Sequence, residues 1–146
     1  MSNVNEQLEI TGHLQICLND KLVRDIPNLV VTAGKVFVAA RMIGTSAGVM
    51  SHMEVGTGTT NPAAGNTALE SVVSSSRTAF TTSAAVSGAV VTYVTAFGAG
   101  VGTGALTEAG IFNASSGGTM LCRTEFDVVN KGSADTMTIT WTVTVS

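Results

Sequence analysis

The segment that most constrains the fold is the alternating stretch Thr136–Val145 near the end of the chain. From Met137 to Val145 every second residue is apolar, and the residues between them are threonines. A period of two is typical of a β-strand with one buried face and one solvated face, and β-branched threonine favours extended backbone. The buried face, which includes Trp141, needs a second apolar layer opposite it. The segment therefore predicts sheet packed against sheet.

Further strand-like segments recur along the chain, separated by short stretches of turn-forming residues. Residues 8–18 and 21–26 read as a hairpin around Asn19-Asp20, which Pro27-Asn28 then interrupts. The other predicted strands cover residues 50–56, 77–82, 89–97, 106–113, 120–129 and 136–145. We therefore predict an all-β, mainly antiparallel fold with about eight strands, of the β-sandwich or jelly-roll type.

One segment changes period and predicts a short helix over residues 33–43. Thr32 is placed to cap its start, and Gly44 is placed to end it. A strand over residues 36–38 is the alternative for this segment. The apolar residues that fall on one helical face are Val36, Ala39, Ala40 and Ile43.

The length of 146 residues fits one domain with a core of its own. We predict a flexible N-terminal arm at residues 1–7 and a single β-sandwich domain at residues 8–146. The first nine residues lack the apolar core of a secretion signal, and no stretch approaches the roughly 20 apolar residues of a membrane helix. The expectation is a protein that is not exported through the secretory pathway and has no membrane partner.

Charge is scarce in this chain, at 12% of residues, whereas apolar residues make up 45%. A monomer normally keeps more charge for solubility, so the composition predicts that partners cover much of the surface. The net charge is −3, and lysine and arginine do not cluster. Direct nucleic-acid binding is therefore not expected.

No group of residues has the spacing of a catalytic or metal site. His52 and Glu54 share a strand face, as do Glu125 and Asp127, but a pair of side chains lacks the converging groups that catalysis needs. His13 has no ligand-type neighbours in sequence. We predict no enzymatic activity, no cofactor and no metal.

The two cysteines, Cys17 and Cys122, lie far apart and lack metal or redox spacing. They are interpreted as buried free thiols, and a disulfide between them requires that their strands be neighbours. The glycine-rich stretch Gly98–Gly104 does not precede a helix and lacks the Gly-Lys-Ser/Thr ending of a phosphate loop, so it is interpreted as a flexible hairpin connection. The cationic residues Arg77, Arg123 and Lys131 are candidates for ion pairs or for an interface.

Two blocks of sequence resemble a known class of proteins. They are Glu54–Glu70, which contains Gly56-Thr57-Gly58-Thr59-Thr60-Asn61-Pro62, and Leu106–Thr124, which contains Thr107-Glu108-Ala109-Gly110-Ile111-Phe112-Asn113. The chain resembles small structural proteins of tailed double-stranded DNA bacteriophages from about Leu8 to Val145, and among these it is most similar to capsid cement, or decoration, proteins.

The resemblance implies a virion protein, made in the host cytoplasm, that sits on the outer surface of the capsid. It would form a homo-oligomer, a dimer or trimer, bridge subunits of the major capsid protein and stabilise the shell. The alternatives are a tail, baseplate or fibre component, and a small carbohydrate-binding module or hydrolase. The N-terminal arm and two loops supply most of the expected interface residues, which are Asn3, Asn5, Glu6, Thr59, Asn61, Pro62, Arg77, Gly100, Gly102 and Arg123.

Overall fold

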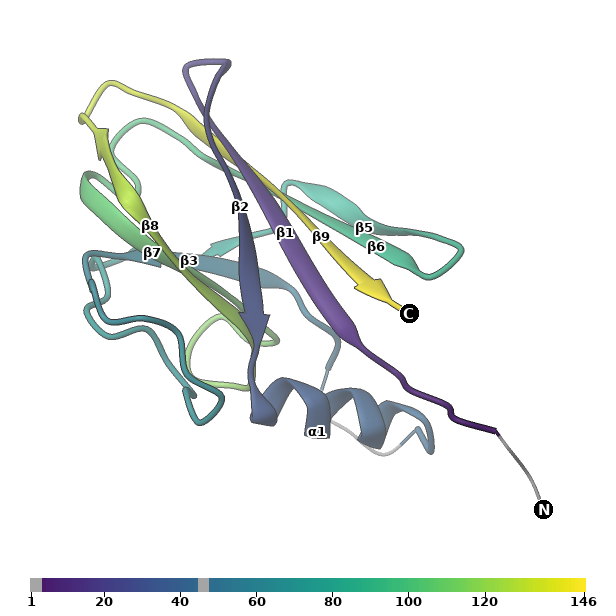
Figure 1. Cartoon of the computed structure of the whole chain (residues 1–146). Coiled ribbons are helices and arrows are strands. Elements are labelled where there is room, and N and C mark those ends of the chain that lie inside the picture. Colours follow the sequence, from purple (N-terminus) through teal and green to yellow (C-terminus); the bar gives the residue numbers. More distant parts are fainter. Residues whose placement is uncertain (1–3, 45–47) are drawn as a thin grey trace.

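The computed structural model describes residues 4–44 and 48–146 and confirms the all-β class with one short helix (Figure 1). Every strand pairing is antiparallel. The elements in chain order are β1 (Ile10–Leu18), β2 (Lys21–Val30), α1 (Thr32–Arg41), β3 (His52–Gly56), β4 (Thr78–Ala79), β5 (Thr82–Ser87), β6 (Val90–Phe97), β7 (Gly104–Phe112), β8 (Met120–Lys131) and β9 (Met137–Val145).

The strands form one curled sheet in the order β4-β3-β7-β8-β2-β1-β9-β6-β5. Strand β2 joins its two halves, because β2 pairs with β1 as far as Asn28 and with β8 from Leu29 onward. The two halves face each other across one apolar core, to which both contribute. The predicted packing of sheet on sheet is thus achieved by a single sheet that curls over itself.

Strand β9 lies between β1 and β6 and shows the predicted alternation. Its apolar residues from Met137 to Val143 are buried, and Trp141 is fully buried. The indole Nε1 of Trp141 donates a hydrogen bond of 2.9 Å to Asn28 Oδ1. Gly12 lies against the same amide, and a Cβ there would overlap Asn28. Glycine at position 12 therefore allows Asn28 to reach the indole.

Helix α1 is present, close to its predicted position, but its capping differs from the prediction. The N-cap is Val31, without a side-chain cap, and the backbone N–H of Thr32 donates to Ala64 O at 2.8 Å. A carbonyl of the loop after β3 therefore accepts a backbone N–H at the start of the helix, where a capping side chain was expected. Gly44 follows the helix with a φ of 72°, as expected of a residue that ends it.

Three strand predictions were wrong. The segment predicted as one strand at residues 77–82 contains only the two-residue β4 before β5 begins at Thr82. Strand β2 continues through Pro27 to Val30 because Pro27 lies beside the point where β2 changes partner, and a strand tolerates a missing N–H there. Strand β5 occupies residues 82–87, which were interpreted largely as a turn because serine and alanine dominate them. The two-residue turn that follows β5 begins at Gly88, which has a φ of 58°.

The glycine-rich stretch Gly98–Gly104 is not a hairpin connection. It leads from β6 to β7, which are not neighbours in the sheet, and therefore crosses from one half to the other. The buried Lys131 donates from Nζ to Gly98 O at 2.9 Å, and burial lowers the pKa of this ammonium group. Gly102 is buried with a φ of 65° beside Val55, so the crossing is packed against the core.

Candidate binding surface at the helical end

Large apolar side chains are exposed around α1, at the end of the molecule from which the N-terminal segment also leaves (Figure 1). The exposed fractions are 72% for Leu8, 63% for Val36, 83% for Met42 and 76% for Ile43. We call these four residues the α1 surface. Isolated exposed apolar residues are ordinary, but a group of them beside apolar grooves is typical of a surface that another molecule covers.

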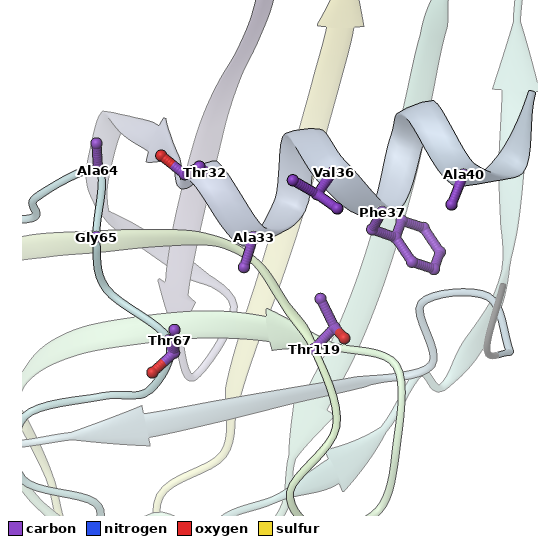
Figure 2. A pocket seen from close by; sticks show the side chains of 9 residues that line it. All are labelled: Thr32, Ala33, Val36, Phe37, Ala40, Ala64, Gly65, Thr67 and Thr119. Atoms are coloured by element: carbon purple, nitrogen blue, oxygen red, sulfur yellow. The ribbon is translucent and has the colours of Figure 1, made fainter.

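The first groove lies between α1 and the loop after β3, and its volume is about 610 Å³. Figure 2 shows Ala33, Val36, Phe37 and Ala40 along the helix, with Thr67 and Thr119 across from them. The polar side chains that line it belong to threonines, and none of its lining residues is titratable. This groove suits an apolar side chain and offers no group for acid–base chemistry.

A second groove, of about 460 Å³, lies between α1 and the N-terminal segment. Residues 8–11 line one side, and Lys35, Val38, Ala39 and Met42 of the helical region line the other. Leu8 and Met42 therefore belong both to this groove and to the α1 surface. A groove therefore flanks the helix on each side, and the second one is lined by the charged Glu9 and Lys35 as well as by apolar residues.

The wall of the first groove is held in place by a buried ion pair. Glu108 on β7 and Arg123 on β8 are 0% and 1% exposed, and Arg123 donates to Glu108 Oε1 from Nε at 3.1 Å and from Nη2 at 3.0 Å. The Glu108 carboxylate also accepts three backbone N–H groups of the loop, from Gly58 at 2.8 Å, Glu70 at 2.9 Å and Ser71 at 2.8 Å. One carboxylate thus fixes both ends of the loop to the sheet.

Arg123 and Glu70 extend this network into the middle of the loop. Arg123 donates to Asn66 Oδ1 at 3.1 Å and to Thr60 O at 2.9 Å. The Glu70 carboxylate accepts the Thr60 hydroxyl and the N–H of Thr59, and these bonds lower the pKa of Glu70. The groove wall at residues 64–67 is therefore preformed.

A second ion pair fixes the neighbouring loop between β7 and β8. Arg77 donates from Nε to Glu54 Oε2 at 3.0 Å, and its guanidinium carbon lies 3.8 Å from the centre of the Phe112 ring. Its Nη1 also donates to the carbonyls of Ala114 at 2.8 Å and Gly117 at 3.1 Å. Of the two roles predicted for Arg77 and Arg123, ion pairing is the one that the structure supports. The prediction that Arg123 contacts a partner was wrong, because the sheet and the loop bury its side chain.

The remaining predicted interface residues are divided between two ends of the molecule. Asn5, Glu6, Thr59 and Asn61 are exposed, and Pro62 is half-buried. Gly100 is exposed in the crossing near Lys131, at the opposite end of β8 from α1. The 12 residues of β8 separate these ends by roughly 35 Å. Gly102 is buried, so its prediction as a contact was wrong, and Asn3 lies outside the described residues.

The histidines and the carboxylates considered above as catalytic candidates do not come together in one site. Glu54 pairs with Arg77, while His52 Nδ1 lies 2.6 Å from Ser51 Oγ, and burial together with Arg77 lowers the pKa of His52. His13 pairs with Asp25 on the adjacent strand, a contact that the sequence analysis missed. Over residues 4–44 and 48–146, no group of three or more histidine, cysteine, aspartate or glutamate residues is placed to hold a metal ion.

The two cysteines do not form a disulfide. Cys122 is buried and Cys17 is half-buried, and both are free thiols. Burial raises the pKa of the Cys122 thiol. In the part of the chain that the structure describes, no helix has the length and apolar character needed to cross a membrane.

The α1 surface was not predicted, because the sequence pattern groups the apolar residues on one helical face without showing whether that face is buried. Val36 and Ile43 belong to that face and are exposed, while the helix presents Gly34 to β8. A Cβ on Gly34 would overlap the backbone of Leu121. Gly34 is the feature of the sequence that could have indicated which side of the helix packs against β8.

Comparison with protein-family models, curated proteins and solved structures gives no significant match.

Proposed function

We propose that this protein is a capsid cement protein of a tailed bacteriophage, which binds the major capsid protein on the outside of the assembled shell. The observation that carries the proposal is the α1 surface with its two flanking grooves. The resemblance of the segments Glu54–Glu70 and Leu106–Thr124 to phage structural proteins supports the choice of partner. The scarcity of charge, at 12% of residues, supports a protein that works while covered by others.

The proposed mechanism is mechanical. Covering the α1 surface removes apolar side chains from water, which contributes about 1.5–3 kcal/mol for each large side chain that becomes fully buried. The loop that forms the groove wall is already fixed by Glu108 and Arg123, so little chain ordering opposes binding. A molecule that binds the assembled shell and not its separated subunits stabilises the shell by mass action.

The two blocks of resemblance meet in one structural unit, which explains why they occur together. The first block contains the loop of residues 57–70, and the second contains both Glu108 and Arg123, which bind that loop. Their shared role is to hold the wall beside α1. In this proposal Glu108 and Arg123 preserve the shape of the binding surface, while residues 64–67 and Thr119 of the same two blocks line the groove that the partner enters.

Replacing Met42 by glutamate is expected to weaken binding to heads at least tenfold. The substitution places a charge in the proposed contact, and the loss of one buried apolar side chain corresponds to about 1.4 kcal/mol or more. Because Met42 is 83% exposed in the free protein, the free energy of unfolding should hardly change. The measurement is co-sedimentation of purified protein with heads of the encoding phage assembled without it.

The matched control is Val128→Glu, which adds the same charge at an exposed apolar residue near the end of β8 remote from α1. This variant should bind heads as the unmodified protein does. Equal binding by the Met42→Glu variant and the unmodified protein would show that the α1 surface is not the contact.

A further inference from the structure

Strand β5 is a free sheet edge of unusual composition. It ends the strand order, beside β6, and all six of its residues are exposed. No residue between Arg77 and Glu108 is charged, so the whole β5–β6 hairpin carries no charge. Figure 1 shows this hairpin at the edge of the curled sheet, to the right of β9.

Proteins usually protect such an edge from pairing with other chains. Common devices are lysine or proline in the edge strand, bulges, and edge strands of very few residues. The opposite edge, β4, has two residues and follows Arg77 directly. Strand β5 has neither charge nor proline, and its register irregularity, between Thr82 and Ala85, leaves Ala85–Ser87 regularly paired up to the turn.

The outer part of this hairpin also lacks a core of its own. Val86 is opposite Val91, and Val86 is 70% exposed while Val90 and Val91 are half-buried. Strand β6 is paired with β9 along its whole length, so the outer ladder of backbone groups at this edge belongs to β5. A third strand alongside β5 would bond its outward N–H and C=O groups and shield these valines.

The register identifies which backbone groups are available. Ser87 pairs with Val90 across a two-residue turn whose first residue, Gly88, has the positive φ of a type II′ turn. Hydrogen-bonded and non-hydrogen-bonded pairs alternate along an antiparallel ladder, so the next residue, Val86, directs its backbone N–H and C=O away from β6. Val86 is therefore at the centre of Ala85–Ser87, the regularly paired part of the free edge.

We propose that β5 pairs antiparallel with β5 of a second copy of this chain, so that the two curled sheets continue into each other across a two-fold axis. An antiparallel strand pair is self-complementary, as an isologous contact requires. Each chain carries a net charge of −3, and the uncharged hairpin is where two copies meet with little electrostatic repulsion. This contact uses elements other than the α1 surface and does not depend on the proposed function.

The test compares Val86→Lys with the matched control Val86→Thr. Lysine at this position brings two positive charges together across the axis, whereas threonine keeps a β-branched, uncharged side chain. By sedimentation velocity over a concentration series, the unmodified protein and Val86→Thr should approach twice the 14.8 kDa mass of one chain. Val86→Lys should self-associate at least tenfold more weakly, with unchanged thermal unfolding at dilutions where all three proteins are monomeric.

Hydrogen exchange supplies a second readout at the strand itself. Amides of residues 82–87 should exchange more slowly as the concentration of the unmodified protein rises, and this dependence should be lost in Val86→Lys. A single-chain mass at every concentration, or a dimer that Val86→Lys leaves intact, overturns the proposal. The Met42→Glu variant separates the two proposals, because it should still dimerise while failing to bind heads.

Discussion

Replacing Glu108 by alanine is expected to lower the free energy of unfolding by about 3–5 kcal/mol. The substitution leaves the Arg123 guanidinium, which is 1% exposed, without its carboxylate partner. It also leaves the backbone N–H groups of Gly58, Glu70 and Ser71 without their acceptor. Urea unfolding followed by tryptophan fluorescence measures the loss, since Trp141 is the only tryptophan.

The matched control is Glu125→Ala on β8, directly across the ladder from Glu108. Glu125 is partly exposed, so its loss should change the free energy of unfolding by no more than about 0.5 kcal/mol. Replacing Glu108 by leucine and Arg123 by methionine together should recover only part of the stability, because the three loop N–H groups remain unpaired. Full recovery, or an equal loss in Glu125→Ala, would contradict the role given to Glu108.

Replacing Trp141 by alanine is expected to cost about 3–5 kcal/mol of unfolding free energy, because a fully buried aromatic side chain leaves a cavity. Trp141 lies on β9 between β1 and β6, so the cavity would open in the middle of one half of the sheet. Thermal unfolding monitored by far-ultraviolet circular dichroism measures this loss without relying on the indole.

Two further variants separate packing from hydrogen bonding at this position. Trp141→Phe keeps most of the ring volume but removes the donor to Asn28 Oδ1, and should cost about 1–3 kcal/mol. Thr140→Ala, on the outward face of the same strand, should cost less than about 1 kcal/mol. A Trp141→Ala variant as stable as Thr140→Ala would show that β9 does not pack against the core as described.

The local sequence pattern was sufficient to predict a strand or helix where apolar residues recur with a clear period. The threonine strand at 136–145 and the helix near 33–43 were both recognised from period together with local residue preferences, to within one or two residues. Strand β5 was missed because serine and alanine have weak strand preference, and its pairing with β6 decides its conformation. The continuation of β2 past Pro27 was not predicted, because there β2 pairs with residues of β8 about 95 positions away in the sequence.

The candidate surface was harder to predict than the fold. The direction of the α1 face depends on Gly34 meeting Leu121, and that contact joins residues far apart in sequence. The role of Glu108 was not recognised, because a single carboxylate within an alternating strand gives no sign that three loop N–H groups converge on it. Arg123 was recognised as an ion-pair candidate, but its partner was not.

The most direct test of the proposed function is the copy number of the protein in purified virions, measured by gel densitometry against the major capsid protein and repeated on heads separated from tails. The cement proposal predicts a ratio near one to one, or a simple fraction of it, in the head fraction. A few copies per particle, confined to the tail fraction, would contradict it and favour a tail or baseplate component.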